Sequence, residues 1–257
     1  MESQRVITHT IASPFFTGPL RSPARLQNSW THESFIDEVA AAVGADPVEY
    51  RLRHLNNVSV LEEVSGNRLK DVIRAAAQLA NWDPRPSPKP GNPRTGVVTG
   101  RGIACCLYEG DNGYCALVVE VEVDQDTGHV VARQFFAAND CGPITNPDGL
   151  KNQVEGGIYQ GMSRALAEEV TWDDEKITSI DWITYPVQTF GRTPTPVITT
   201  VLIDRRDGQE AMGSGETTIT IVAAAIANAI YDATGARVRQ LPLTPARVRA
   251  AIEAARA

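Results

Sequence analysis

The order of apolar and polar residues divides the chain into a helical first part and a second part that mixes strands with helices. Apolar residues recur at the helical period between Ser29 and Leu55, and again from Arg68 to Leu79. Gly44 ends the first helix, and Asp46-Pro47 is typical of the capped start of the next. The apolar stripe of the first helix consists of Phe35, Ile36, Val39, Ala40 and Val43.

A proline-rich stretch, residues 83–95, separates the two parts, because it holds too much proline for a helix or a central strand. Strand patterns follow it at Ile103–Leu107, Ala116–Asp124 and Val130–Ala138. Asp126-Thr127-Gly128 is typical of a hairpin turn between the last two of these strands. The stretch of prolines therefore indicates a linker or a surface loop.

The remainder of the second part is predicted to alternate helices with two further strands. Asn146-Pro147 indicates the capped start of a helix that runs to Glu169. Thr178–Tyr185 and Val197–Ile203 have the composition of strands. The run Ile219–Ile230 is too apolar to face water on any side, and it predicts a buried helix.

These patterns predict an α+β, or mixed α/β, fold. We expect a helical segment over residues 1–82, the linker at residues 83–95, and a subdomain of sheet and helices over residues 96–257. A chain of 257 residues is long enough to bury a sizeable core.

Charge and composition exclude several classes of protein and of site. The net charge of −7 argues against general nucleic-acid binding, which needs a basic face. No apolar run reaches membrane-spanning length, and the N-terminal residues carry no signal-peptide pattern. We therefore expect a cytoplasmic location, unless a partner subunit carries an export signal. The four cysteines lack CxxC spacing and the four histidines are scattered, so no protein-held metal site is predicted; Cys105-Cys106 is interpreted as two buried small residues.

The run Gly213-Ser214-Gly215-Glu216, directly before the apolar helix, is the most informative feature of the chain. Two glycines allow a tight turn, and the helix after it points free N–H groups and its positive dipole end back at that turn. A carboxylate fixed there either caps the helix or takes part in chemistry. Because acidic residues are common in first helical turns, residue types alone favour the structural interpretation.

The sequence that begins with this turn (GSGETTITIVAAAIANAIYDATGARV) resembles the C-terminal segment of the molybdopterin-binding subunit of the xanthine oxidase family of molybdenum hydroxylases. Three further blocks agree with that family in the same order, namely Arg21–Glu38, Asp140–Gly157 and Gly161–Glu169. The resemblance is greatest to the branch of isoquinoline 1-oxidoreductase and the nicotinate dehydrogenase large subunit. It covers nearly the whole chain but only the C-terminal part of a much longer subunit. It implies a cofactor-facing loop in residues 1–82 and a catalytic turn in residues 96–257.

The resemblance also implies a role for four residues. Glu216 matches the family's glutamate that acts as general base beside the metal, and Gly215 would leave room for the metal's ligands. Arg21 falls in the family's loop over the molybdenum, and Gln153 matches a glutamine that contacts the pyranopterin. A carboxamide suits a pterin or a phosphate, because it both donates and accepts hydrogen bonds.

Three glycines after Gln153 remove side chains from one stretch of its helix, and they indicate a close approach by another group; they are Gly156, Gly157 and Gly161. Packing of a second helix is the alternative to a cofactor there, and the residues alone favour it.

Two departures from the family affect what can be carried over. Ser22 and Pro23 stand where the animal xanthine oxidases have Gly and Phe, so the aromatic clamp for a planar purine is missing. Thr217 stands where the family commonly has Pro directly after the glutamate, although a threonine there can cap the helix. Asp140-Cys141-Gly142 and Asn146-Pro147 match the family as structural turn residues.

The resemblance implies a multi-subunit enzyme that hydroxylates an electron-poor carbon of an N-heteroaromatic ring with oxygen derived from water and with Glu216 as base. The cofactor would be molybdenum-molybdopterin, in the cytosine dinucleotide form of bacterial members, shared with a larger molybdopterin-binding chain because no M-G-Q-G loop occurs here. Electrons would leave through a [2Fe–2S] subunit, with an FAD subunit or a cytochrome c as possible further partners. Oxidation of an aldehyde is the chemical alternative, and a catalytically silent assembly module is the alternative of a different class.

Overall fold

The computed structural model describes residues 5, 7–55, 66–109, 112–191, 193–206 and 208–257. Its strands are β1 (Val97–Leu107), β2 (Tyr114–Asp124), β3 (Val130–Asp140) and β4 (Val197–Leu202). Its helices are α1 (Arg25–Ala42), α2 (Pro47–His54), α3 (Gly66–Leu79), α4 (Pro147–Leu166), α5 (Ile219–Thr234) and α6 (Pro245–Arg256). The predicted α+β class is confirmed.

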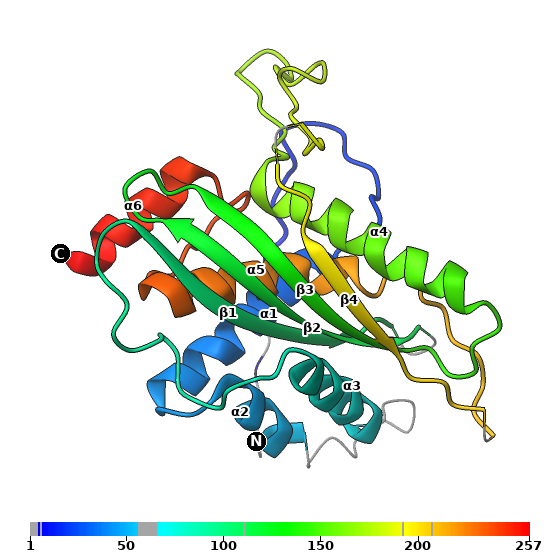
Figure 1. Ribbon diagram of the computed structural model, residues 1–257. Helices are drawn as coiled ribbons and strands as arrows, with labels where there is room; N and C mark the ends of the chain where they lie inside the picture. Colours follow the sequence, from blue (N-terminus) through cyan, green and yellow to red (C-terminus); the bar gives the residue numbers. More distant parts are fainter. Residues whose placement is uncertain (1–4, 6, 56–65, 110–111, 192, 207) are drawn as a thin grey trace.

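The strands form one sheet in the order β1-β2-β3-β4 (Figure 1). β1, β2 and β3 are an antiparallel meander, and β4 adds to β3 in parallel. α4 and α5 pack on one face of the sheet and α3 on the other, while α1 lies against α5. The sheet is therefore covered on both faces, and its strands are buried along most of their length.

The three antiparallel strands agree with their predicted positions, except that β1 begins earlier than the expected Ile103. It extends back through Gly100 and Gly102, which the strand pattern treats as breakers. A side chain at either glycine would collide with the backbone of α5. The glycines thus let α5 approach the sheet closely, and this contact compensates for their low strand propensity. The predicted turn at Gly128 is confirmed, with a φ of 77° and a hydrogen bond to the Asp124 carbonyl of 2.7 Å.

Helix α5 is the buried centre of the fold, as its apolar sequence predicts. Nearly every residue from Ile219 to Ala233 is buried, including Asn228 and Asp232. Gly235 ends the helix in the left-handed conformation, with a φ of 74°, and its N–H donates to the Tyr231 carbonyl.

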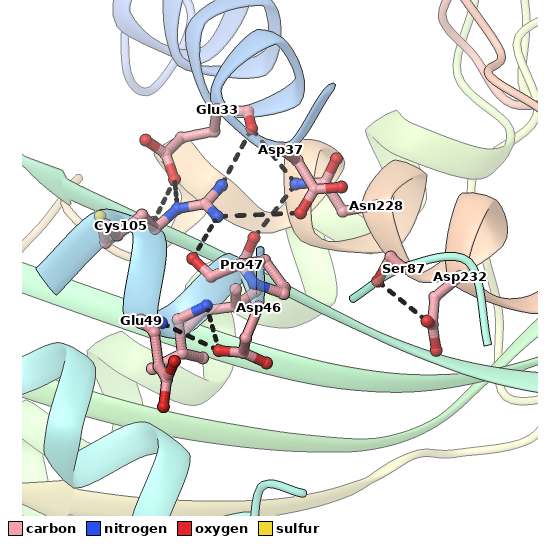
Figure 2. A network of polar contacts seen from close by, with 12 residues as sticks. Glu33, Asp37, Asp46, Pro47, Glu49, Ser87, Cys105, Asn228 and Asp232 are labelled. Carbon is pink, nitrogen blue, oxygen red and sulfur yellow. Dashed lines mark hydrogen bonds and ion pairs between the residues drawn. The ribbon is translucent and has the colours of Figure 1, made fainter. Parts of the chain in front are cut away.

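Helix α1 turns only part of its apolar stripe toward the core, where Ala40 is 1% exposed. Phe35 and Val43 are 61% and 63% exposed, whereas Glu33 and Asp37 are buried. Arg51 of α2 makes this possible, since its Nε donates to Glu33 at 3.0 Å and its guanidinium lies 3.7 Å from Asp37 (Figure 2). Buried charges persist in proteins when they are paired and hydrogen-bonded in this way.

The proline-rich stretch contains neither helix nor strand, as predicted. It is nevertheless fixed to the body, because Arg85 forms two hydrogen bonds with Asp232 of α5, at 2.6 and 2.7 Å. Ser87 donates a third hydrogen bond to the same carboxylate (Figure 2). The division into segments 1–82, 83–95 and 96–257 stays a prediction.

The predicted strand at Thr178–Tyr185 does not form. This part of the chain lies in an irregular segment, residues 170–191, which we call the arm. Asp181 sets up a turn instead, because its side chain accepts hydrogen bonds from the N–H groups of Ile183 and Thr184. The local side-chain-to-backbone bonds override the strand propensity of the isoleucines and aromatics around them.

Candidate active site

The loop before α1 has a strained backbone that points into the protein. Ser22 and Ala24 have φ values of 64° and 60°, which non-glycine residues rarely adopt. Ser22 is 2% exposed, and its backbone N–H donates to Glu216 Oε1 at 2.8 Å. Strain of this kind persists only where the surroundings fix it, and it is concentrated at functional sites.

Glu216 is half-buried in the turn before α5, and both of its carboxylate oxygens are held. Oε1 accepts from the Ser22 N–H, and Oε2 accepts from the Tyr108 hydroxyl at 2.9 Å. Thr220, in the first turn of α5, donates its hydroxyl to the Glu216 carbonyl at 2.8 Å, and its hydroxyl oxygen lies 2.7 Å from that of Ser22. The carboxylate therefore has one orientation, fixed by the loop, by the end of β1 and by α5.

Arg21 joins the remaining predicted residues. Its Nε donates to the Gly215 carbonyl at 2.6 Å, and its Nη2 donates to Gln153 Oε1 at 3.0 Å. Its Nη1 donates to Gln160 Oε1 at 3.2 Å. The structure thus brings Arg21, Gln153, Gly215 and Glu216 together from three separate segments. Their roles toward a cofactor or substrate stay predictions.

Three further residues complete this cluster, and sequence reasoning missed all of them. Tyr108 follows an apolar strand without any motif around it. Gln160 lies two turns after Gln153 on the same helix, a spacing that could have identified it. Arg164, one turn further, donates to the Arg21 carbonyl at 2.7 Å and so fixes the strained loop to α4. Burial together with the Glu216 hydrogen bond raises the pKa of Tyr108 to about 12, so its hydroxyl stays protonated near neutral pH.

The sequence allows two interpretations of the glycines in α4, which are close packing of a second helix and space for a cofactor. A side chain on Gly161 would overlap Val222, and one on Gly157 would crowd the start of α5. These two positions serve helix packing. Gly156 faces open space, as does Gly215.

The cluster is compatible with a molybdopterin on its open side. Gln153 and Gly215 are exposed, and apart from the local backbone no atom of the described residues lies within 4 Å of where a Cβ on Gly215 or Gly156 would stand. A guanidinium and two carboxamides supply donors and acceptors of the kind that a pterin ring and a phosphate need. Within the part of the chain that the structure describes, no three His, Cys, Asp or Glu residues lie together as a metal site. A molybdopterin bound here would therefore lie on an open polar surface.

Three other expectations from the sequence can be compared with the structure, and one of them is wrong. Thr217 does not cap α5: the cap position is Thr218, without a side-chain hydrogen bond, and Thr217 Oγ1 is buried without a partner among the described residues. Cys105 and Cys106 are buried free thiols, as predicted, and burial raises the pKa of both. Asp140 is fully buried between Arg68 and Arg205, which agrees with a structural role.

Comparison with known proteins identifies the family. Residues 108–194 match the molybdopterin cofactor-binding domain family. A nicotinate dehydrogenase subunit of Pseudomonas putida is 39% identical over 239 residues, which are 91% of this chain. The beta subunit of isoquinoline 1-oxidoreductase from Brevundimonas diminuta is 31% identical over 220 residues, or 86% of this chain. The chain belongs to the xanthine oxidase family.

It corresponds to the C-terminal part of that family's molybdopterin-binding subunit. The aldehyde oxidoreductase of Desulfovibrio gigas has the same fold, with a TM-score of 0.69 and 17% identity over 91% of this chain and 41% of that chain. The chain spans only 19% of the nicotinate dehydrogenase subunit and 26% of the isoquinoline 1-oxidoreductase subunit. Within the described residues, none of the helices combines the length and the hydropathy that a membrane crossing requires.

Proposed function

We propose that this chain is part of a multi-subunit molybdenum hydroxylase in which Glu216 is the general base. The observation that carries the proposal is the geometry of Glu216, whose two carboxylate oxygens each accept one hydrogen bond from a fixed donor. A carboxylate has about four acceptor positions, so the remaining lone pairs are free to take a proton. A base held in one orientation meets the first requirement of general-base catalysis, which is geometric.

When bound, the molybdenum-molybdopterin cofactor, here proposed as the cytosine dinucleotide form, supplies the two-electron oxidation. Gln153 would hold it through its exposed carboxamide, while Arg21 fixes that carboxamide and the Gly215 carbonyl at the same time. Gly215 lets the group approach the turn, because a side chain there would project into the open space that the group needs. In this arrangement Glu216 would take up the proton that the reaction releases.

The proposed substrate is an N-heteroaromatic ring, hydroxylated at the electron-poor carbon next to nitrogen. The names of the nicotinate and isoquinoline relatives support this class. Oxidation of an aldehyde is the second candidate, since the molybdenum-binding subunit of an Escherichia coli aldehyde oxidoreductase is 38% identical over 49% of this chain.

The proposal requires partner chains. The cluster is open to solvent at Gln153 and Gly215, whereas a base and a cofactor of this kind work in a site that excludes water. We propose that a larger molybdopterin-binding portion closes the site, and that a [2Fe–2S] subunit, with an FAD subunit or a cytochrome c, receives the electrons.

The deciding experiment compares Glu216→Gln with Glu253→Gln in the purified complex. Glu253 is an exposed residue of α6 and serves as a matched control. Glu216→Gln keeps the size of the side chain and one acceptor oxygen but removes the base. We expect turnover to fall by orders of magnitude with molybdenum content unchanged, and the control to behave as wild type. Wild-type turnover of Glu216→Gln would instead indicate that the chain is a silent assembly module.

A further inference from the structure

Two neighbouring segments expose large apolar side chains. They are the arm, residues 170–191, and the N-terminal segment, residues 7–20. The arm projects beyond the end of α4, and the N-terminal segment runs beside it (Figure 1). Phe15 and Trp172 join the two, with ring centroids 5.2 Å apart. The exposed apolar residues are Ile7, Ile11, Phe16, Leu20, Val170, Trp172, Ile177, Ile180, Trp182, Ile183 and Phe190.

The exposure is large, and it involves residues that proteins normally bury. Phe16 is 97% exposed, Phe190 88% and Trp182 74%. Scattered apolar side chains on a surface need no explanation, but contiguous apolar patches mark interaction sites. Aromatic residues of this kind also provide much of the binding energy in protein interfaces.

The arm is ordered by its own polar side chains. Asp181 Oδ1 accepts from the N–H groups of Ile183 and Thr184 at 3.0 and 2.9 Å. Asp173 Oδ1 accepts from the N–H groups of Glu175 and Lys176, both at 2.9 Å. These backbone hydrogen bonds lower the pKa of both aspartates, so the turns hold at neutral pH. Polar side chains thus shape the arm, while apolar ones point outward in a fixed arrangement, which lowers the entropy lost on binding.

The arm is also continuous with the candidate active site. Tyr185 donates to Glu168 Oε2 at 2.9 Å, and the Gln188 N–H donates to Ser163 Oγ at 3.0 Å. Both contacts are to α4 or its end, and α4 also carries Gln153. The N-terminal segment leads directly into Arg21. A body that covers the arm is therefore placed to cover the open side of the cluster as well.

We propose that the arm and the N-terminal segment form the docking surface for the remaining portion of the molybdopterin-binding subunit. This rests on the proposed function. The size of that portion is clear from the relatives, of which this chain spans only 19% and 26%. The arm lies almost wholly within the region that matches the molybdopterin cofactor-binding domain family, so it is a regular part of that domain.

The chemistry of the arm defines the surface that receives it. Trp182, Ile183 and Phe190 require an apolar groove. The arm carries four exposed acidic side chains and one lysine, so its charge is negative. The acidic residues are Asp173, Asp174, Glu175 and Asp181. The groove should therefore have a basic rim, since complementary charge favours the correct partner and excludes others.

The test uses the complex purified through a tag on this chain, with the photo-crosslinking residue p-benzoylphenylalanine in place of Trp182. We expect the crosslinked peptide to belong to the molybdopterin-binding portion. A crosslink to a second copy of this chain, or binding of the arm to lipid vesicles instead, would overturn the proposal. A crosslink to that portion in a complex without molybdenum would contradict the proposed function and leave the docking surface intact.

A matched pair of substitutions measures the contribution of the arm. Ile183→Glu puts a charge on an 84% exposed residue of the arm, and Val43→Glu does the same on a 63% exposed residue that ends α1. We expect Ile183→Glu to lower recovery of the molybdopterin-binding portion at least tenfold, with the melting temperature of this chain unchanged. Val43→Glu should leave recovery at the wild-type level. Equal recovery with both variants would show that the arm is not the docking surface.

Discussion

Tyr108→Phe tests whether the orientation of Glu216 matters for catalysis. The substitution removes one hydroxyl from a residue that is 2% exposed and keeps the ring, so packing around the end of β1 is preserved. It also removes the only donor to Oε2 that the described residues show, 2.9 Å away, while the Ser22 N–H still holds Oε1. The carboxylate can then rotate about the one contact that remains.

The size of the effect follows from that hydrogen bond. A hydrogen bond to a charged group contributes about 1.5–3 kcal/mol. If the transition state needs the held orientation, kcat should fall between about tenfold and about a hundredfold, since about 1.4 kcal/mol corresponds to a factor of ten. KM should change little, because the hydroxyl faces Glu216 and not the open side. Molybdenum content should stay at the wild-type level.

The assay is steady-state turnover per molybdenum, with thermal melting of the same preparations. Tyr50→Phe is the control, since it removes a hydroxyl from a residue of α2 that makes no hydrogen bond with the described residues of the cluster. The pKa of Tyr108 is raised to about 12, so the hydroxyl is a donor throughout the range in which turnover is measured. A lower melting temperature combined with wild-type kcat would refute the reasoning and leave Tyr108 with a structural role alone.

Three further predictions concern the fold and the cluster. Burial acts to raise the pKa of Glu33, but the charge of Arg51 outweighs it and the pKa falls from 4.5 to about 2. The Glu33 carboxylate therefore stabilises the fold fully above about pH 4.5, and this stabilisation is lost as the pH falls toward 2. Glu33→Gln should reduce the free energy of unfolding at pH 7 by about 1.5–3 kcal/mol in denaturant titration, because it removes the charge of the carboxylate closest to the buried Arg51 and leaves only Asp37, 3.7 Å away, as its ion-pair partner; a loss below about 1 kcal/mol would contradict this. Gly161→Ala should reduce the same free energy by about 1–3 kcal/mol through overpacking against α5, whereas Gly156→Ala, which faces open space, should not. Arg21→Lys should lower molybdenum content, measured by elemental analysis, because one ammonium cannot reach Gly215, Gln153 and Gln160 as the guanidinium does; unchanged content would show that Arg21 does not help to hold the cofactor.

The sequence predicts most of the elements of this fold because their signals are local. The caps at Asp46 and Asn146 bind the N–H groups that the cap rule assigns to them, and α5 is as buried as its composition indicates. The strand expected at Thr178–Tyr185 is the error. Its isoleucines and aromatics have strand propensity, but no neighbouring strand among the described residues is placed to bind it, and Asp181 supplies a turn instead.

In the candidate site, motifs predict some of the residues, and only the folded structure identifies the others. Arg21, Gln153, Gly215 and Glu216 were predicted through motifs, and the structure brings them together, although no single pattern states that Arg21 contacts both of the other segments. Tyr108 could not be predicted. Its hydroxyl meets Glu216 only because β1 ends beside the start of α5, and that contact joins residues 108 positions apart.

The orientation of α1 shows why its apolar stripe is a poor guide to its buried surface. An apolar stripe normally marks the face that packs inward. In α1 the inward face carries Glu33 and Asp37, because the buried Arg51 and the partly buried Arg237 lie there and need partners. A charged inner face tolerates little displacement, since each ion pair and hydrogen bond has a required geometry. That face holds α1 against α5, and the two helices place Ser22 and Glu216 within hydrogen-bonding distance. None of the residues labelled in Figure 2 contacts Glu216, but the network fixes α1, which directly follows the loop of Ser22. A substitution at Asp37, whose ion-pair partners are Arg51 and Arg237 and not residues of the site, should therefore alter turnover.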